Sequence, residues 1–260
     1  MTVKTPSKPI PVVLMHGIGG AARIWEPQIA FFERHKLHPM PLDLPGYGGR
    51  PPVDTMNFED LAADVDATIA RLGFDRPVLL GHSMGGMIAQ TMLRRSPSGY
   101  RAAILCSTSP AFGRSDGDFQ RQFIADRLAP LDAGQSMADI AEDSFARITG
   151  PAGVTSPYRA LGISTLTHTP VATYRAAVTC ITTFDERENL ARIATPVLCL
   201  TGGLDTSAPA RMMEKMASKI PGAHFTCLPG IGHLPNIEAP DAFNAAVLEF
   251  LTGLSTAQKD

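Results

Sequence analysis

Two hydrophobic patterns alternate along the chain. Short runs of apolar and β-branched residues are typical of buried strands, and longer segments with an apolar residue every three or four positions are typical of amphipathic helices. The first pattern predicts strands at residues 10–15, 37–42, 77–80, 102–106, 196–200 and 224–228. The second predicts helices at about residues 23–33, 58–72, 84–94, 208–218 and 239–251. Because strands and helices alternate, we expect a parallel sheet with helices on both faces.

The segment from about residue 110 to residue 190 interrupts this alternation. Helical patterns continue there, at 120–128, 136–148 and 171–179, without a convincing strand. The segment enters directly after a strand end, and ligands of open α/β sheets bind at the carboxyl edge of the strands. We therefore predict a core of residues 1–109 and 191–260 and a helical cap, or lid, of residues 110–190. Extra helices that pack on one face of the sheet are the alternative.

A serine between glycines joins the third expected strand to the helix that follows it. The string Gly-His-Ser-Met-Gly at residues 81–85 places Ser83 on this turn, and a strand, a G-x-S-x-G turn and a helix in this order form a nucleophile elbow. Glycines are needed there because a Cβ atom would collide with neighbouring backbone. The first amides of the helix then point toward negative charge that forms near the serine. A purely structural turn is the alternative, and the placement favours the elbow.

An elbow serine needs a base and an acid that orients the base, in the chain order serine, acid, histidine. Asp205 directly follows the strand expected at 196–200, so we place its carboxylate at the carboxyl edge of the sheet. A turn that caps the next helix is its structural alternative, and Asp185 and Glu186 are competitors that precede a strand. His233 lies on the loop after the last expected strand. We therefore expect Asp205 as the acid and His233 as the general base.

Two donors that do not have to move should stabilise the oxyanion. One is expected to be the N–H of Met84, the residue after the nucleophile. The other should come from the loop His-Gly-Ile-Gly-Gly at residues 16–20, with Ile18 as the preferred donor and Gly19 as the second choice. A dinucleotide-binding loop is not expected here, because the G-x-G-x-x-G spacing is absent and no suitable acidic residue follows the next strand.

With these motifs the chain resembles the α/β-hydrolase superfamily over nearly its whole length. The matching strings are HGIGG at 16–20, DLPGYGGR at 43–50, GHSMGG at 81–86, GGLD at 202–205 and GIGHLPNIEAP at 230–240. The resemblance implies an α/β-hydrolase fold and cofactor-free cleavage of a small-molecule ester or lactone through an acyl-enzyme. Such proteins usually begin with one or two extra strands. Only about nine residues precede the first strand here, so we expect about six parallel strands and at most a frayed seventh.

Within the superfamily the chain is similar to the group of 3-oxoadipate enol-lactonases, meta-cleavage-product hydrolases and small carboxylesterases. An enol-lactonase substrate carries a carboxylate, which arginine binds best. Arg127 is the preferred residue for this role, with Arg121 and Arg175 as other candidates in the cap. Trp25, which follows the oxyanion loop, is a second candidate for the pocket, and a place in the core is its alternative.

Three other functions fit the same residues. Hydrolysis of a carbon–carbon bond of the meta-cleavage type would use the same triad. A cofactor-free perhydrolase or acyltransferase would also use it. A small-molecule receptor on the same scaffold is the non-enzymatic alternative, because a fold does not fix a function.

The composition of the chain limits the classes of partner that it is expected to bind. The net charge is −2 and no cluster of Lys and Arg occurs, so neither nucleic acid nor an anionic membrane is expected as a partner. No apolar stretch approaches the roughly 18 residues of a membrane span, and the N-terminal residues lack the apolar region of a signal peptide. The four cysteines do not have metal-ligand spacing. We expect free buried thiols, no metal and a cytoplasmic location.

Overall fold

A computed structural model describes residues 8–112 and 117–257 of the chain. Its centre is a sheet of six parallel strands in the order β2-β1-β3-β4-β5-β6. The expected parallel sheet of about six strands is therefore confirmed, whereas the frayed seventh strand would fall on residues outside the described part. The strands are β1 (Ile10–Met15), β2 (Leu37–Leu42), β3 (Val78–His82), β4 (Ala102–Cys106), β5 (Val197–Gly202) and β6 (His224–Leu228).

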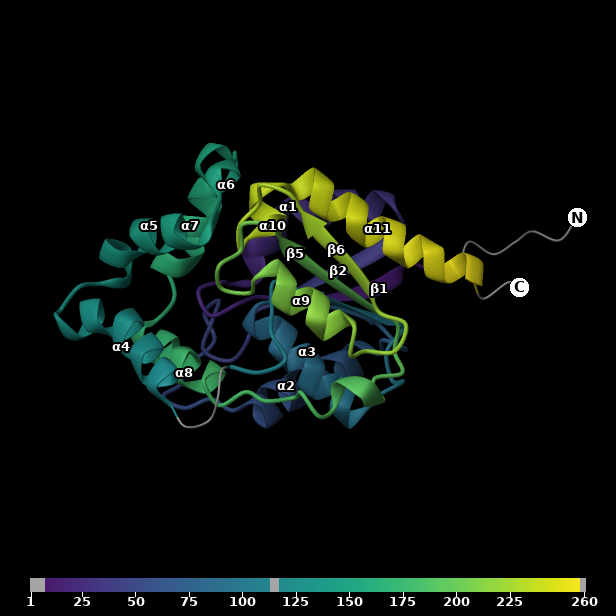
Figure 1. Cartoon of the computed structure of the whole chain (residues 1–260), viewed down its shortest axis with the longest axis horizontal. Helices are drawn as coiled ribbons and strands as arrows, with labels where there is room; N and C mark the ends of the chain where they lie inside the picture. The colour runs from purple at the N-terminus through teal and green to yellow at the C-terminus, as the bar shows by residue number, and fades with distance from the viewer. Residues whose placement is uncertain (1–7, 113–116, 258–260) are drawn as a thin grey trace, which may run out of the picture.

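Helices cover both faces of the sheet (Figure 1). On one face lie α1 (Glu26–Arg34) and α11 (Pro240–Ala257), and on the other lie α2 (Phe58–Leu72), α3 (Met84–Arg95) and α9 (Ala210–Ala217). The short elements are the 3-10 helices η1 (Ala22–Trp25) and η2 (Leu190–Arg192) and the helix α10 (Pro235–Glu238). The helix expected at 23–33 is divided into η1 and α1, because the proline after Glu26 favours a helix start there.

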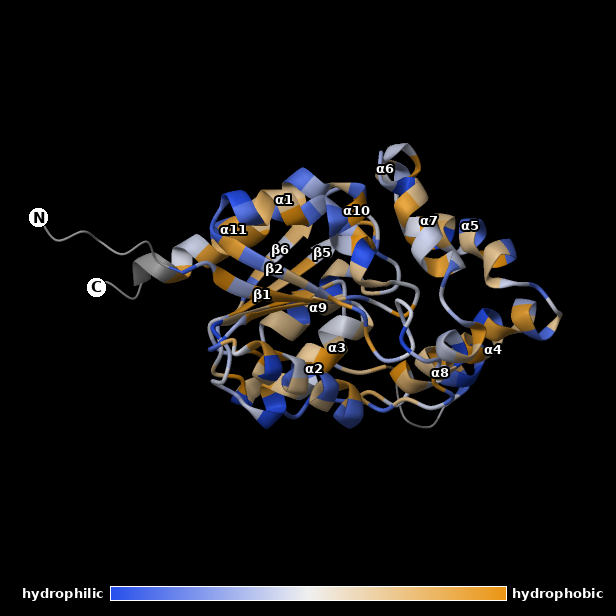
Figure 2. Cartoon of the chain, turned by 180° about the vertical axis from the view of Figure 1, so that it is seen from behind, coloured by the Kyte–Doolittle hydropathy of each residue, from blue (hydrophilic) through white to orange (hydrophobic). Residues whose placement is uncertain are grey.

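The strands are hydrophobic along their whole length because both faces of the sheet are buried. In β1, Val13 and Met15 pack with the helices on the α2 and α3 side, whereas Val12 and Leu14 pack with those on the α1 and α11 side. Successive side chains of a strand point to opposite faces, so a sheet between two helical layers needs continuous apolar runs. Figure 2 shows these apolar strands between two layers of helices whose outer faces are polar.

Among the residues that the structure describes, five α-helices are inserted between β4 and β5 and lie beside the sheet (Figure 1). They pack mainly as two pairs, α4 with α8 and α5 with α7, and an isolated antiparallel bridge between Ala111 and Asp185 joins the two ends of the insertion. The bounds are α4 (Asp118–Asp132), α5 (Met137–Ile148), α6 (Pro151–Thr155), α7 (Arg159–Thr167) and α8 (Val171–Ile181). The expected helices correspond to α4, α5 and α8, whereas α6 and α7 were not predicted.

Candidate active site

Ser83 lies on a strained turn between β3 and α3. Its φ is 53° and its ψ is −116°, a conformation that a residue with a Cβ atom rarely adopts and that costs on the order of 1–3 kcal/mol. The flanking glycines make the turn possible. A Cβ atom at Gly81 would lie 2.2 Å from the Gly85 carbonyl oxygen, and one at Gly85 would lie 2.2 Å from the Met15 carbonyl oxygen. The glycines of this motif therefore have the steric role that the sequence predicts.

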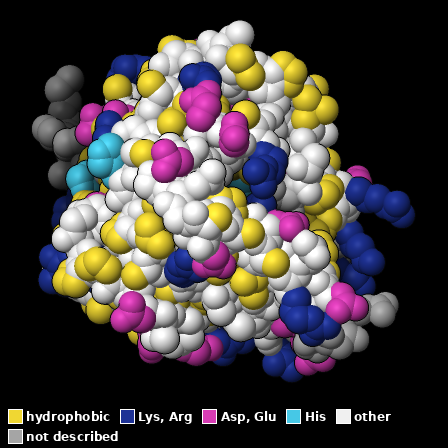
Figure 3. All heavy atoms as spheres, turned by 90° about the vertical axis from the view of Figure 1, so that its left-hand side faces the viewer, with side chains coloured by type: hydrophobic (Ala, Val, Ile, Leu, Met, Phe, Trp, Pro, Cys, Tyr) yellow, Lys and Arg dark blue, Asp and Glu magenta, His cyan; other side chains and the backbone are white. Residues whose placement is uncertain are grey.

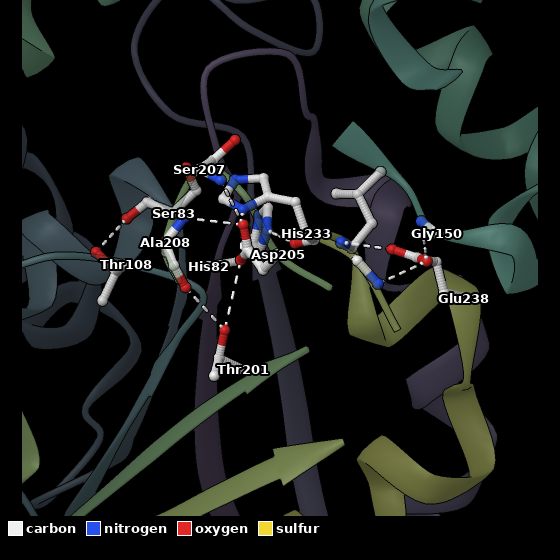
Figure 4. A network of polar contacts seen from close by, with 12 residues as sticks. His82, Ser83, Thr108, Gly150, Thr201, Asp205, Ser207, Ala208, His233 and Glu238 are labelled. Carbon is white, nitrogen blue, oxygen red and sulfur yellow. Dashed lines mark hydrogen bonds and ion pairs between the residues drawn. The ribbon is translucent and has the colours of Figure 1, made fainter. Parts of the chain in front are cut away.

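His233 and Asp205 form a buried hydrogen-bonded pair at the carboxyl edge of the sheet (Figure 4). His233 Nδ1 lies 2.8 Å from Asp205 Oδ2. The other carboxylate oxygen, Oδ1, accepts hydrogen bonds of 2.8 Å from the amides of Ser207 and Ala208. Burial raises the pKa of Asp205, but the charge and hydrogen bond of His233 and the Ala208 amide outweigh this and lower it to about 2. An ionised Asp205 makes Nδ1 of His233 the donor, so the Nε2 lone pair can accept a proton.

The backbone of His233 is held on both sides. Its N–H donates a hydrogen bond of 2.8 Å to the carbonyl oxygen of Ile148, at the end of α5. Its carbonyl oxygen lies 2.7 Å from Nε2 of His82, the residue before Ser83. Burial, together with the neighbouring His233, lowers the pKa of His82 to about 3, so this ring is neutral at neutral pH and Nε2 is the donor. His82 therefore links the turn that carries Ser83 to the loop that carries His233.

The loop after β1 lies beside Ser83 and is anchored by other side chains. The Ile18 carbonyl oxygen accepts a hydrogen bond of 2.9 Å from the Tyr47 hydroxyl, and the Ala22 amide donates one of 2.7 Å to Asp43 Oδ1. Ile18 lines the same cavity as Ser83. Met84 is the first residue of α3, where amides have no acceptor within the helix. In the described part of the chain, neither the Ile18 amide nor the Met84 amide donates a hydrogen bond to a backbone carbonyl in the loops and turns.

Ser83 and His233 line a cavity of about 610 Å³ between the sheet edge and the inserted helices. Its walls are mostly apolar. Arg127 on α4 and Arg147 on α5 are its charged lining residues, and no Asp or Glu of the described residues lines it. The half-buried Arg127 guanidinium lies 4.6 Å from the centroid of the Phe123 ring, and burial lowers its pKa, with a further contribution from Arg147. The cavity therefore combines an apolar interior with positive charge contributed by the insertion.

The structure separates the other substrate-binding candidates from this cavity. Arg121 pairs with Asp118 and Arg175 pairs with Asp132, and neither arginine lines the cavity. Trp25 is fully buried, with its ring centroid 6.2 Å from that of Phe243. Trp25 therefore takes the alternative place that the sequence offers, in the core, and does not line the cavity.

Two residues near the candidate site were missed by the sequence analysis. Arg147 lies in the last turn of α5, and no sequence signal distinguishes it from a solvated helix residue. Glu238 is buried beside the loop that carries His233, and it belongs to the string GIGHLPNIEAP. The competing acids are engaged elsewhere, because Asp185 pairs with Arg187 and Glu186 pairs with Arg94.

Residues 8–112 and 117–257 contain no group of three or more His, Cys, Asp or Glu side chains that could hold a metal ion. Over the same residues no helix has the length and apolar character needed to cross a membrane. All four cysteines are free. Cys106, Cys180 and Cys199 are buried, as expected, whereas Cys227 is only half-buried. On the face that carries the insertion, basic and acidic side chains intermingle (Figure 3).

Comparison with known proteins finds relatives that are hydrolases, among them esterases and an enol-lactonase. A model with the description "Alpha/beta hydrolase family" matches residues 12–246. Pimeloyl-(acyl-carrier protein) methyl ester esterase of Yersinia enterocolitica is 27% identical over 252 residues, which cover 92% of each protein. An enol-lactonase from Burkholderia xenovorans LB400 has a TM-score of 0.84 at 25% identity and covers 95% of this chain and 92% of its own. A thermophilic esterase from Thermogutta terrifontis has a TM-score of 0.83 at 26% identity, with coverages of 94% and 90%.

Proposed function

The chain belongs to the alpha/beta hydrolase family, and we propose that it is a serine hydrolase that cleaves a small-molecule carboxylic ester or lactone through an acyl-enzyme. One observation carries this proposal. The hydrogen-bonded pair of His233 and Asp205 lies at a cavity that also contains Ser83 on its strained turn. Esterases and an enol-lactonase among the similar proteins support ester or lactone chemistry.

In this mechanism the Ser83 Oγ attacks the substrate carbonyl carbon while His233 Nε2 takes the hydroxyl proton. The ionised Asp205 stabilises the imidazolium that forms. The amides of Met84 and Ile18 bind the oxyanion of the tetrahedral intermediate. His233 then gives its proton to the leaving oxygen. In the second half of the reaction His233 takes a proton from water, which attacks the acyl carbon. His233 then returns this proton to Ser83 Oγ as the acyl–oxygen bond breaks, and the carboxylic acid is released.

We further propose that the insertion of residues 110–190 is a cap that selects the substrate. It contributes much of the wall that faces Ser83, including both arginines. Arginine binds carboxylates through paired hydrogen bonds, and a half-buried positive charge in an apolar cavity favours an anionic ligand. Arg127, supported by Arg147, would therefore bind a carboxylate on the substrate at the cap side of the cavity while the ester or lactone lies at Ser83.

Hydrolysis of p-nitrophenyl esters of graded acyl length and of enol-lactones tests this function. The wild-type protein should turn over at least one of these substrates, and Ser83→Ala and His233→Ala should each lower kcat by about 10⁴-fold or more. Ser144→Ala is a matched control, because Ser144 lines the same cavity from α5 and should keep its activity.

Three results would contradict the proposal. Undiminished hydrolysis by Ser83→Ala would exclude this serine as the nucleophile. Failure to turn over any activated ester or lactone, combined with tight retention of a small molecule, would favour the receptor. Turnover of a vinylogous diketone in preference to all esters would favour carbon–carbon hydrolysis by the same residues.

A further inference from the structure

Glu238, the last residue of α10, carries a buried carboxylate that accepts hydrogen bonds from three backbone amides. Its Oε2 accepts hydrogen bonds of 2.8 Å from Gly150 and 2.9 Å from Gly232, and its Oε1 accepts one of 3.0 Å from Leu234 (Figure 4). Gly232 and Leu234 are the two neighbours of His233 in the chain. One carboxylate therefore holds the backbone on both sides of the candidate base.

The third amide comes from the inserted helices, since Gly150 lies between α5 and α6. Two more hydrogen bonds join the same segments: His233 N–H donates to Ile148 O at 2.8 Å, and Ser156 Oγ donates to Ile237 O at 2.6 Å. A Cβ atom at Gly232 would lie 2.4 Å from the Gly150 nitrogen. The insertion and the His233 loop are therefore in direct backbone contact, and Glu238 lies at this contact.

A buried carboxylate is costly unless its oxygens are hydrogen-bonded, and a buried amide without an acceptor is costly as well. Glu238 makes no ion pair with Lys or Arg in the described part of the chain. Burial raises its pKa, while the hydrogen bonds from the three amides oppose this shift. A residue that served packing alone would not need two oxygen acceptors here. The arrangement of three amides around one carboxylate instead fixes the path of the loop.

We propose that Glu238 is a positioning residue: it orients His233 for proton transfer by fixing the two flanking amides, and it ties this loop to the cap through Gly150. The inference rests on the proposed role of His233 as the general base. It implies that the position of the cap and the alignment of the base are mechanically linked. A small displacement of His233 should slow the chemical step, whereas the hydrogen bonds to Ile148 O and Ile237 O still hold the cap, so the walls that bind the substrate should change little.

The test compares Glu238→Gln and Glu238→Asp with a control, Glu249→Gln, at an exposed position of α11. In Glu238→Gln the amide group places N–H donors opposite at least one backbone N–H. Glu238→Asp keeps the charge but is one methylene shorter. Each kcat is measured with the best p-nitrophenyl ester and divided by the concentration of sites that react with a fluorophosphonate, so that unfolded protein does not count.

We expect Glu238→Gln to lower kcat per reactive site by about tenfold or more and to leave KM within about twofold. Glu238→Asp should recover part of the lost kcat, and Glu249→Gln should match the wild type. A kcat per site in Glu238→Gln equal to that of the wild type would overturn the proposal. If that variant does not fold, Glu238→Asp decides, because an unchanged kcat in it would also overturn the proposal. Activity in Ser83→Ala would instead refute the proposed function itself.

Discussion

At the residue scale, the absence of a side chain at two positions decides whether the turn at Ser83 can form. Gly81 and Gly85 face carbonyl oxygens at distances that no Cβ atom tolerates. Ser83 itself keeps a left-handed φ of 53°, which its surroundings must enforce. The hydrogen bond from Ser83 N–H to Cys106 O, at 2.9 Å, is one of these restraints. The geometry of this turn therefore depends on backbone packing as much as on the serine.

Substituting Gly85 by alanine should destabilise the fold. The new Cβ would lie 2.2 Å from the Met15 carbonyl oxygen, so strands or the helix must shift, and we expect a loss of about 2 kcal/mol or more in the free energy of unfolding. Gly253→Ala is the control, because an added Cβ there meets nothing within 4 Å in α11 and should stabilise the helix by up to about 1 kcal/mol. Urea denaturation measures the free energy of unfolding of both variants. Equal changes in the two would refute the steric explanation for Gly85.

Residues whose role depends on local spacing could be predicted from the sequence, and those that act across distant contacts could not. Ser83, Asp205 and His233 follow strand ends in the order that the motifs require, so their common sheet edge was predictable. Arg147 and Glu238 were not. Arg147 becomes a cavity residue only through the packing of the insertion, and Glu238 contacts Gly150 across 88 positions of sequence.

At the scale of the elements, the strands were easier to predict than the inserted helices. A short continuous apolar run is buried on both sides only as a strand between two helical layers. The strand bounds expected from the sequence therefore agree with those of the structure within about two residues. The helix α7 was missed because its nine residues, RALGISTLT, include one glycine and three β-branched residues, which have weak helix propensity. Tertiary packing against α5 therefore decides its structure.

The placement of Arg127 on α4 and Arg147 on α5 predicts a charge preference. A p-nitrophenyl monoester of a dicarboxylic acid should be hydrolysed with a higher kcat/KM than an uncharged ester of equal length. Arg127→Gln should lower kcat/KM for the charged substrate by about tenfold, as expected for loss of a hydrogen-bonded charge pair, and change the uncharged one little. Arg121→Gln, which removes an exposed arginine paired with Asp118, is the control. Equal losses on both substrates would refute the anion site.

At the scale of the whole molecule, two buried neutral histidines connect folding to pH. His16 and His82 lie at the carboxyl edge of the sheet, at the end of β1 and of β3. Burial lowers the pKa of His16 to about 4, and burial with the nearby His233 lowers that of His82 to about 3. Both rings keep fixed hydrogen bonds to backbone, His16 Nδ1 with Gly17 O at 2.8 Å and His82 Nε2 with His233 O at 2.7 Å.

In the unfolded chain these histidines take up protons near pH 6.5. In the folded protein they take up protons only near their lowered pKa values, about 4 for His16 and about 3 for His82. Stability is therefore fully present above about pH 6.5 and is lost as the pH falls toward 4. Each histidine contributes up to about 1.4 kcal/mol per pH unit to the free energy of unfolding in this window.

Urea denaturation at pH 7.5 and pH 5 should give a lower free energy of unfolding at pH 5. His82→Gln should reduce this difference and His38→Gln, at an exposed position, should not. A difference that both variants leave intact would contradict the account.

Covalent labelling of Ser83 tests the central claim most directly. After the protein reacts with a fluorophosphonate, intact-mass spectrometry should find one adduct, and peptide mapping should place it on Ser83. His233→Ala should react far more slowly, because the hydroxyl then lacks its base. Ser83→Ala should remain unlabelled. An adduct on any other residue, or undiminished labelling of Ser83→Ala, would contradict the assignment of Ser83 as the nucleophile of this hydrolase.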